Sequence, residues 1–225
     1  SMSSSYALKD AVPMPNGNFL VVGYTDLFGP GSTNGYWMEV TAAGTLQNAQ
    51  ALGSANAEQL EGVKAARYGG YLVTGFTSTN TGFYAKLNGN LQVLWKKSVA
   101  TIPIAGFQAP DSSFWLVEML QSGCNTLRFV HLDQNGNDLD EYTTLLTTAT
   151  ASPSVYAHNL DAEMACDGTI FVSSSYVELS PTRSKLLVTK FNTMTHLGST
   201  ANYRLAGTAL GGAPYYDAVP MKLLI

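Results

Sequence analysis

Short runs of apolar and β-branched residues recur along the chain, separated by turns rich in glycine, asparagine and serine. The runs lack the 3.6-residue period of an amphipathic helix, and their length and alternation are typical of β-strands. They fall into groups of four, which predicts repeated units of four short antiparallel strands. In chain order the predicted strands cover residues 6–14, 19–25, 36–40 and 46–52; 60–66, 71–77, 83–87 and 91–99; 104–109, 114–120, 127–132 and 139–146; and 159–165, 170–176, 185–191 and 199–206.

One segment at the start of the chain returns near its end. Asp10-Ala11-Val12-Pro13-Met14 recurs as Asp217-Ala218-Val219-Pro220-Met221, and weaker copies begin at residues 61, 105 and 161. The spacing between the starts of these copies is typical of repeated supersecondary units. The residue after each copy's first position is small, which would let innermost strands crowd around an axis: Ala11, Gly62, Gly106, Ala162 and Ala218.

These repeats predict an all-β propeller. A four-stranded sheet cannot bury both of its faces alone, whereas radial stacking of such sheets buries them and leaves short, protected edges. We expect four full four-stranded blades plus a fifth opening or closing strand. Residues 1–5 are interpreted as a tag or flexible N-terminus, and residues 6–225 as one domain. Its repeats span residues 6–53, 54–101, 102–150 and 151–207, with a partial repeat at 208–225.

The copy that begins at residue 217 has two interpretations. It begins a further blade of a longer propeller, or it packs on the sheets and closes a ring of four blades. Because residues 221–225 are mostly apolar, we expect Leu223 to Ile225 to pack against repeat one in the same chain or against a partner chain. Deleting residues 215–225 should therefore cost several kcal/mol, since each buried aliphatic side chain contributes roughly 1.5–3 kcal/mol.

Three stretches carry a family resemblance: Asn18 to Thr25, Gly70 to Thr77, and Gly82 through Asn90 to Lys97. They resemble bacterial extracellular β-propeller repeats, which combine an Asp-Ala strand, an Asp-Gly-Gly-Tyr turn, a Gly-x-Thr strand end and an aromatic-x-Lys-Leu-Asp-x-x-Gly third strand. The likeness weakens in repeats three and four, where Glu118-Met119-Leu120 and Ser173-Ser174-Ser175 replace Gly-x-Thr. The resemblance implies a fold and no activity, because propellers host many unrelated functions.

Composition narrows the class of protein. Charged residues make up only 12% of the 225 residues, beside 21 glycines and 11% aromatics, which suits an extracellular or cell-surface β protein. The net charge is −4 and no basic run occurs, which argues against nucleic acid as a partner. No apolar stretch is long enough for a transmembrane helix. We predict no cofactor.

The loops indicate where a ligand would bind. Turns between the first and second and between the third and fourth strands are uniformly short, while the opposite edge carries longer, unlike connections such as 26–35, 78–82, 121–126, 177–184 and 147–158. Long variable loops on a rigid scaffold commonly carry function. The candidate ligand-binding residues at that edge are the acids Asp10, Glu61, Asp161 and Asp217 and the aromatics Phe28, Tyr156, Tyr215 and Tyr216.

The acids admit two interpretations. They form a cation site or polar ligand mouth, or each caps backbone amides of the neighbouring blade. Carboxylates gathered at an axis should repel one another unless a cation or amides compensate. Neither a Gly-x-Ser-x-Gly elbow nor a P-loop is present, so we predict no catalytic residue. Neither cysteine sits in a Cys-x-x-Cys pair, and we predict no metal site.

Other polar residues have simpler interpretations. Asp133 to Asn137 is better explained as a hairpin turn than as a calcium loop. His131 falls at the third-strand position that Glu39, Lys86 and Lys190 occupy in the other repeats, and the three tryptophans fall inside strands and are expected in the core. Cys124 and Cys166 are expected to be buried or half-buried thiols, with a disulfide as the alternative.

Two functions from different classes follow. The first is a non-catalytic ligand-binding or scaffold propeller of a secreted or cell-surface bacterial protein, with a carbohydrate or protein ligand at the long-loop edge. The alternative is a polysaccharide-processing hydrolase or lyase that uses carboxylates near the axis. The assembly is expected to be a monomer, or a dimer through an open propeller edge.

Overall fold

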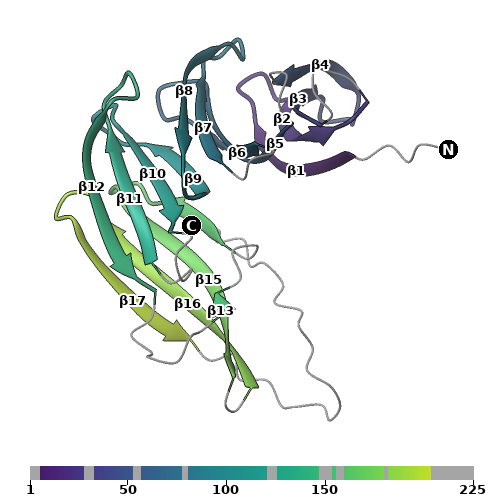
Figure 1. The fold of residues 1–225 in the computed structure, drawn as a ribbon. Coiled ribbons are helices and arrows are strands. Elements are labelled where there is room, and N and C mark those ends of the chain that lie inside the picture. Colours follow the sequence, from purple (N-terminus) through teal and green to yellow (C-terminus); the bar gives the residue numbers. More distant parts are fainter. Residues whose placement is uncertain are drawn as a thin grey trace. The chain divides into compact units, whose positions relative to one another are not determined.

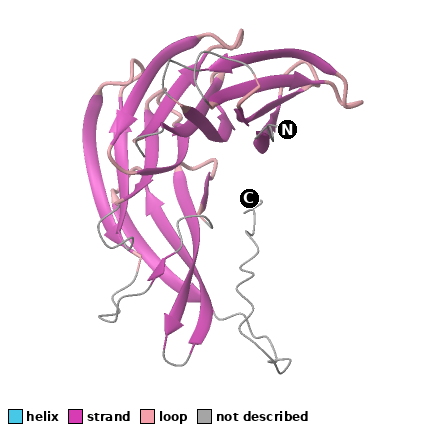
Figure 2. Cartoon of the chain, turned by 45° about the vertical axis from the view of Figure 1, so that its right-hand side comes forward, coloured by secondary structure: helices cyan, strands magenta, loops and turns pink. Residues whose placement is uncertain are grey.

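A computed structural model describes residues 6–27, 33–52, 57–77, 81–120, 126–146, 154–155, 160–179 and 182–203. Within these ranges the chain forms strands β1 to β17 and no helix (Figures 1 and 2). The predicted all-β class is confirmed. The partial fifth repeat, with its copy at Asp217, lies outside the described residues.

Three four-stranded antiparallel sheets and one five-stranded sheet make up the fold. Each of the first three is an up-and-down meander, as a propeller blade requires. The first contains β1 (Tyr6–Pro13), β2 (Phe19–Thr25), β3 (Asn34–Val40) and β4 (Leu46–Leu52). The second contains β5 (Glu58–Ala65), β6 (Tyr71–Thr77), β7 (Gly82–Leu87) and β8 (Val93–Val99). The third contains β9 (Ile102–Gln108), β10 (Phe114–Met119), β11 (Thr126–Leu132) and β12 (Asp138–Leu145).

The fourth sheet departs from the predicted plan. Its strands are β13 (Ser154–Val155), β14 (Asp161–Met164), β15 (Thr169–Leu179), β16 (Thr182–Asn192) and β17 (Leu197–Tyr203). Both β13 and β14 pair with β15, so the first-strand position is shared by two short strands. The long loop predicted for residues 177–184 is wrong. Strands β15 and β16 remain paired out to Leu179 and Thr182, because the antiparallel backbone ladder continues without a shift to that point.

The chain divides into two compact units, which are described separately. Unit 1 comprises Ser1–Leu116 and His131–Leu139, and unit 2 comprises Val117–Val130 and Asp140–Ile225. The first two sheets lie in unit 1 and the fourth sheet in unit 2, while the strands of the third sheet contribute to both.

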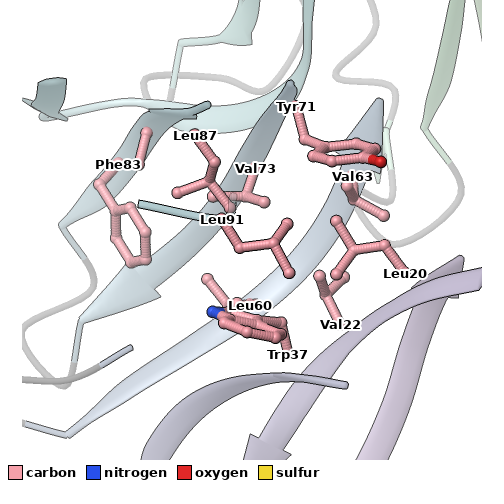
Figure 3. Close-up of a cluster of buried hydrophobic side chains, with 11 residues drawn as sticks. Leu20, Val22, Trp37, Leu60, Val63, Tyr71, Val73, Phe83, Leu87 and Leu91 are labelled. Atoms are coloured by element: carbon pink, nitrogen blue, oxygen red, sulfur yellow. The ribbon is translucent and has the colours of Figure 1, made fainter. Parts of the chain in front are cut away.

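The core of unit 1 lies between the first and second sheets (Figure 3). The first sheet contributes Leu20, Val22 and Trp37, which face an apolar surface of the second sheet. The residues of that surface are Leu60, Val63, Tyr71, Val73, Phe83, Ala85, Leu87 and Leu91. Each is nearly inaccessible, and a fully buried side chain of this kind contributes about 1.5–3 kcal/mol. This packing positions β1 beside β5.

Seven hairpin turns share one geometry. In each, the amide of the first residue donates to the carbonyl four residues later, and the amide three residues on donates back to the first carbonyl. The residue at that third step has positive φ, as in a type I turn followed by a left-handed residue. It is Gly17, Gly44, Gly69, Leu91, Ser112, Gly136 or Gly168. The predicted short turns are confirmed, although in the turn containing Asn88-Gly89 the left-handed residue is Leu91.

A bulge in each of the first two inner strands changes how the repeats align. Leu8 pairs with Gly23 and Asp10 with Val22, which leaves Lys9 as the extra residue. In the second sheet Leu60 pairs with Gly75 and Gly62 with Thr74, which leaves Glu61. Glu61 therefore corresponds to Lys9, and the sequence alignment of Glu61 with Asp10 is wrong by one residue.

The same register moves the predicted small position. Val63 of the second sheet, and not Gly62, matches Ala11, so a small residue is not required in every inner strand. In the fourth sheet the sequence alignment of Asp161 with Asp10 holds. Asp161 lies as far before Met164, the last residue of β14, as Asp10 lies before Pro13, the last residue of β1, and both stretches pair with the next strand without a shift.

The bulges explain the Gly-x-Thr strand ends. A Cβ at Gly23 would lie 1.9 Å from the Ala7 carbonyl oxygen, and one at Gly75 would lie 2.2 Å from that of Gln59. Only glycine allows the inner strand to approach so closely.

Candidate functional site

Three of the predicted site residues lie in the described ranges: Asp10, Glu61 and Asp161. Asp10 and Glu61 belong to unit 1 and Asp161 to unit 2, so only the first two are compared in space. The remaining predicted residues, Phe28, Tyr156, Tyr215, Tyr216 and Asp217, lie outside the described residues.

Asp10 joins the inner strands of the first two sheets. Its Oδ1 accepts a hydrogen bond from the Ala11 amide at 2.9 Å, and its Oδ2 accepts one from the Val63 amide of β5 at 3.1 Å. Gly62 lies beside this bond; a Cβ there would crowd Thr74 Oγ1 at 2.8 Å and would make only ordinary contact with Asp10 Oδ2 at 3.9 Å. The half-buried carboxylate thus caps amides of its own and of the neighbouring sheet.

Glu61 forms a second bridge between the same strands. Lys9 Nζ lies 2.9 Å from Glu61 Oε2, and both side chains are about one-third exposed, at 34% and 29%. Lys9 Nζ also lies 5.5 Å from the centroid of the Tyr24 ring. The two bulged residues carry opposite charges, so the bulges themselves are joined by an ion pair. The sequence does not indicate this pairing, because Lys9 and Glu61 correspond only through the bulges in the two strand registers.

Asp161 repeats part of the Asp10 arrangement in unit 2. Its Oδ1 accepts a hydrogen bond from the Ala162 amide at 2.9 Å, as Asp10 does from Ala11. The Ser173 hydroxyl donates to the Asp161 carbonyl at 3.4 Å. Among the residues that the structure describes, no three His, Cys, Asp or Glu side chains come together as a metal site.

In the first and second sheets, which lie in unit 1, a polar residue on the third strand hydrogen-bonds to the turn between the first two strands. Glu39 Oε1 accepts from Asn18 Nδ2 at 2.5 Å and from Asn16 Nδ2 at 2.8 Å, and these bonds lower the pKa of the Glu39 carboxyl. Lys86 Nζ donates to the carbonyls of Gly69 at 2.6 Å and Leu87 at 3.0 Å. Lys86 is only 5% exposed, and burial lowers the pKa of its ammonium to about 8.

His131 and Lys190 occupy the same third-strand position. His131 stacks on Trp115 with ring centroids 4.3 Å apart and planes 5° from parallel. The Ser113 hydroxyl bond chiefly lowers the pKa of Asp111, and the charge of His131 adds to this effect. The Thr169 amide chiefly lowers the pKa of Asp167, with a contribution from Lys190. Glu39 and Lys86 thus bond directly to the short-turn edge, whereas His131 and Lys190 act on acids of that edge through their charge.

One buried carboxylate was missed by the sequence interpretation. Glu118, on β10, is fully buried, and its Oε2 lies 3.3 Å from Arg128 Nη1. Arg128 also contacts Glu141 through Nε and Nη2. Glu118 replaces the glycine of the Gly-x-Thr ends, so that departure in the sequence was the signal for it.

The remaining predictions are mostly confirmed. Trp37 and Trp115 are buried, while Trp95 is half-buried and meets Phe114 edge-on with centroids 5.4 Å apart. Asp133 accepts bonds from the Asn135 and Asn137 amides within an ordinary hairpin turn. Cys166 is exposed at a turn, so its predicted burial is wrong, and Cys124 lies outside the described residues.

No family model matches the chain, and no curated protein matches it. A protein of unknown function from Bacteroides caccae matches 89% of this chain and 61% of its own length, with 10% identity and a TM-score of 0.53. Puromycin hydrolase matches 89% of this chain and 38% of its own, with 14% identity and a TM-score of 0.40. The WD40 domain of SCAP from fission yeast matches at 10% identity and a TM-score of 0.31, over 93% of this chain and 67% of its own.

The likeness to the Bacteroides caccae protein concerns the fold alone. This chain spans about three-fifths of the length of that protein and less than two-fifths of puromycin hydrolase. The described residues include no helix that is long and apolar enough to cross a membrane.

Proposed function

We propose that the chain is a non-catalytic ligand-binding or scaffold module of a secreted or cell-surface bacterial protein, with a propeller-like fold. The observation that carries this proposal is the environment of Asp10. Both of its carboxylate oxygens accept backbone amide bonds, one of them across to β5. A carboxylate whose two oxygens both accept backbone amide bonds, one of them from the neighbouring sheet, is suited to joining the two sheets.

The difference between the two edges of the sheets supports a ligand at the long-loop edge. The short-turn edge repeats one hydrogen-bonded geometry. The connections at the other edge differ in length, covering residues 26–33, 78–81, 120–125 and 180–181 between paired strands. Regular sheets with unlike loops provide a fixed frame for recognition. Carbohydrate and protein are the ligand classes proposed, since Phe28 falls in the first of these connections, Tyr156 falls in the segment between β13 and β14, and aromatic side chains suit both ligand classes.

Glycan and peptide arrays probed with the full chain test this proposal. Phe28→Ala and Tyr156→Ala should each weaken binding to whatever glycan or peptide is retained. Met194→Ala serves as the matched control, because Met194 is 80% exposed in a turn at the opposite edge and should leave binding unchanged. Binding that persists in both aromatic variants, or that is lost equally in the control, would contradict a site at the long-loop edge.

The enzymatic alternative makes an opposite prediction for Asp10. If an inner-strand carboxylate were catalytic, Asp10→Asn would abolish turnover of a polysaccharide and leave the melting temperature unchanged. The scaffold proposal predicts lower thermal stability instead. We further propose that residues 215–225 complete the sheet system, and their deletion should lower the melting temperature or change the oligomeric mass.

A further inference from the structure

The outer strand of the first sheet, β4, is an edge without a charged residue. Its sequence is Leu46-Gln47-Asn48-Ala49-Gln50-Ala51-Leu52, and within the described part of the chain it pairs only with β3. Figure 1 shows its place at one end of that sheet. The outer strands of the next two sheets carry charges, namely Lys96 and Lys97 in β8 and Asp138, Asp140 and Glu141 in β12. Edge charges oppose pairing with a second chain, and β4 lacks them.

The strand is also accessible. Residues 46–50 are exposed and residues 51 and 52 are half-buried, with Leu46 55% exposed. The ladder with β3 shifts at Gln47, because Val40 pairs with Leu46 and Glu39 with Asn48. The regular part of the edge therefore runs from residue 48 to residue 52, and a partner strand would meet backbone groups there that β3 does not use.

This regular stretch is suited to pairing with itself. An antiparallel pair of two copies centred on Gln50 places Gln50 opposite Gln50, Ala49 opposite Ala51, and Asn48 opposite Leu52. Primary amides can hydrogen-bond to one another across the axis, and alanines bring no steric conflict. A two-fold axis needs such self-complementarity, since each residue meets its counterpart twice. Strand β17 is likewise uncharged, but no primary amide stands at its centre.

We propose that two copies of this chain associate by antiparallel pairing of their β4 strands about Gln50. The absence of charge on β4 removes the repulsion that identical charged edges would create. A single pair of strands buries less than a standard interface of about 1,600 Å², so the dimer should be weak and dependent on concentration. An extended peptide from another protein is the alternative occupant of this edge. Only a second copy of the chain places Gln50 opposite Gln50, so that contact distinguishes the two occupants.

Sedimentation equilibrium of the full chain, from roughly 10 µM to 1 mM, is the first test for an association of this strength. Wild type should dimerise reversibly. Gln50→Lys places two ammonium groups opposite each other and should weaken association by up to about fivefold. Gln47→Lys is the matched control, since it adds the same charge at the bulge outside the paired stretch, and it should weaken association clearly less. Circular dichroism confirms that both variants fold.

Cross-linking supplies a second measurement. With Cys124 and Cys166 replaced by serine, Gln50→Cys should form a disulfide-linked dimer on oxidation, while Gln47→Cys should not. A wild type that stays monomeric throughout would overturn the proposal. A dimer that Gln50→Lys and Gln47→Lys affect equally, or a Gln50→Cys variant that does not cross-link, would overturn it as well.

Discussion

Replacing Asp10 by alanine removes a bridge between the first two sheets. The change deletes two hydrogen bonds to a carboxylate, from the amides of Ala11 and Val63. Hydrogen bonds to a charged group contribute about 1.5–3 kcal/mol each when buried. Asp10 is half-buried, so water replaces part of what is lost, and we expect the free energy of unfolding to fall by about 1–2 kcal/mol. For a chain of this size that lowers the melting temperature by roughly 2–8 °C.

Urea denaturation followed by circular dichroism measures this effect. The midpoint should fall at an unchanged denaturant slope, which assigns the change to native-state stability. Asp140→Ala is the control, because Asp140 is an exposed carboxylate on β12 and its removal should shift the free energy by less than about 0.5 kcal/mol. Equal free energies of unfolding for the two variants would refute the bridging role. Asp10→Asn keeps one acceptor and should fall between wild type and Asp10→Ala.

Three further predictions concern turns, bulges and pH. Gly44→Ala should lower the free energy of unfolding by about 1 kcal/mol, because Gly44 has φ +82° and open space around it. In the equivalent turn, where Ser112 has φ 71°, Ser112→Gly should raise that free energy by a similar amount. Gly75→Ala should lower it by about 3 kcal/mol, because the new Cβ would meet the Gln59 carbonyl. Gly89→Ala, in open space without positive φ, is the control for the substitutions at Gly44, Ser112 and Gly75 in urea denaturation. A loss of unfolding free energy in this control equal to that in Gly44→Ala or Gly75→Ala would contradict these explanations. The pKa of Lys86 is about 8, below its unfolded value near 10.4, so the unfolded chain binds more protons between these values and stability should rise with pH there. Lys86→Met should flatten that rise between pH 8 and 9.5, measured as the urea midpoint at each pH, and an unchanged slope would show that Lys86 is not its source.

Much of the fold was accessible from the sequence because the responsible interactions are local. Alternation of apolar and polar residues marks strands such as β2 and β6, whose predicted bounds match the structure. Glycine in a turn is readable because positive φ excludes most side chains, as at Gly17 and Gly44. The exception at Leu91 shows the limit of this rule, since its left-handed backbone is accompanied by a side chain buried in the core.

The inner strands depended on tertiary structure. A bulge shifts the register by one residue, and nothing in the local sequence distinguishes Glu61 at a bulge from Glu61 in a regular ladder. The Val63 amide that bonds to Asp10 lies on another strand, and the Asn18 side chain that bonds to Glu39 lies in the turn between β1 and β2, so packing brings these groups together. The sequence by itself therefore determined which segments are strands and turns, because those preferences act within a few residues. Only the packed sheets decided which acids cap amides and which pair with lysines, because those bonds join strands that are distant in the chain.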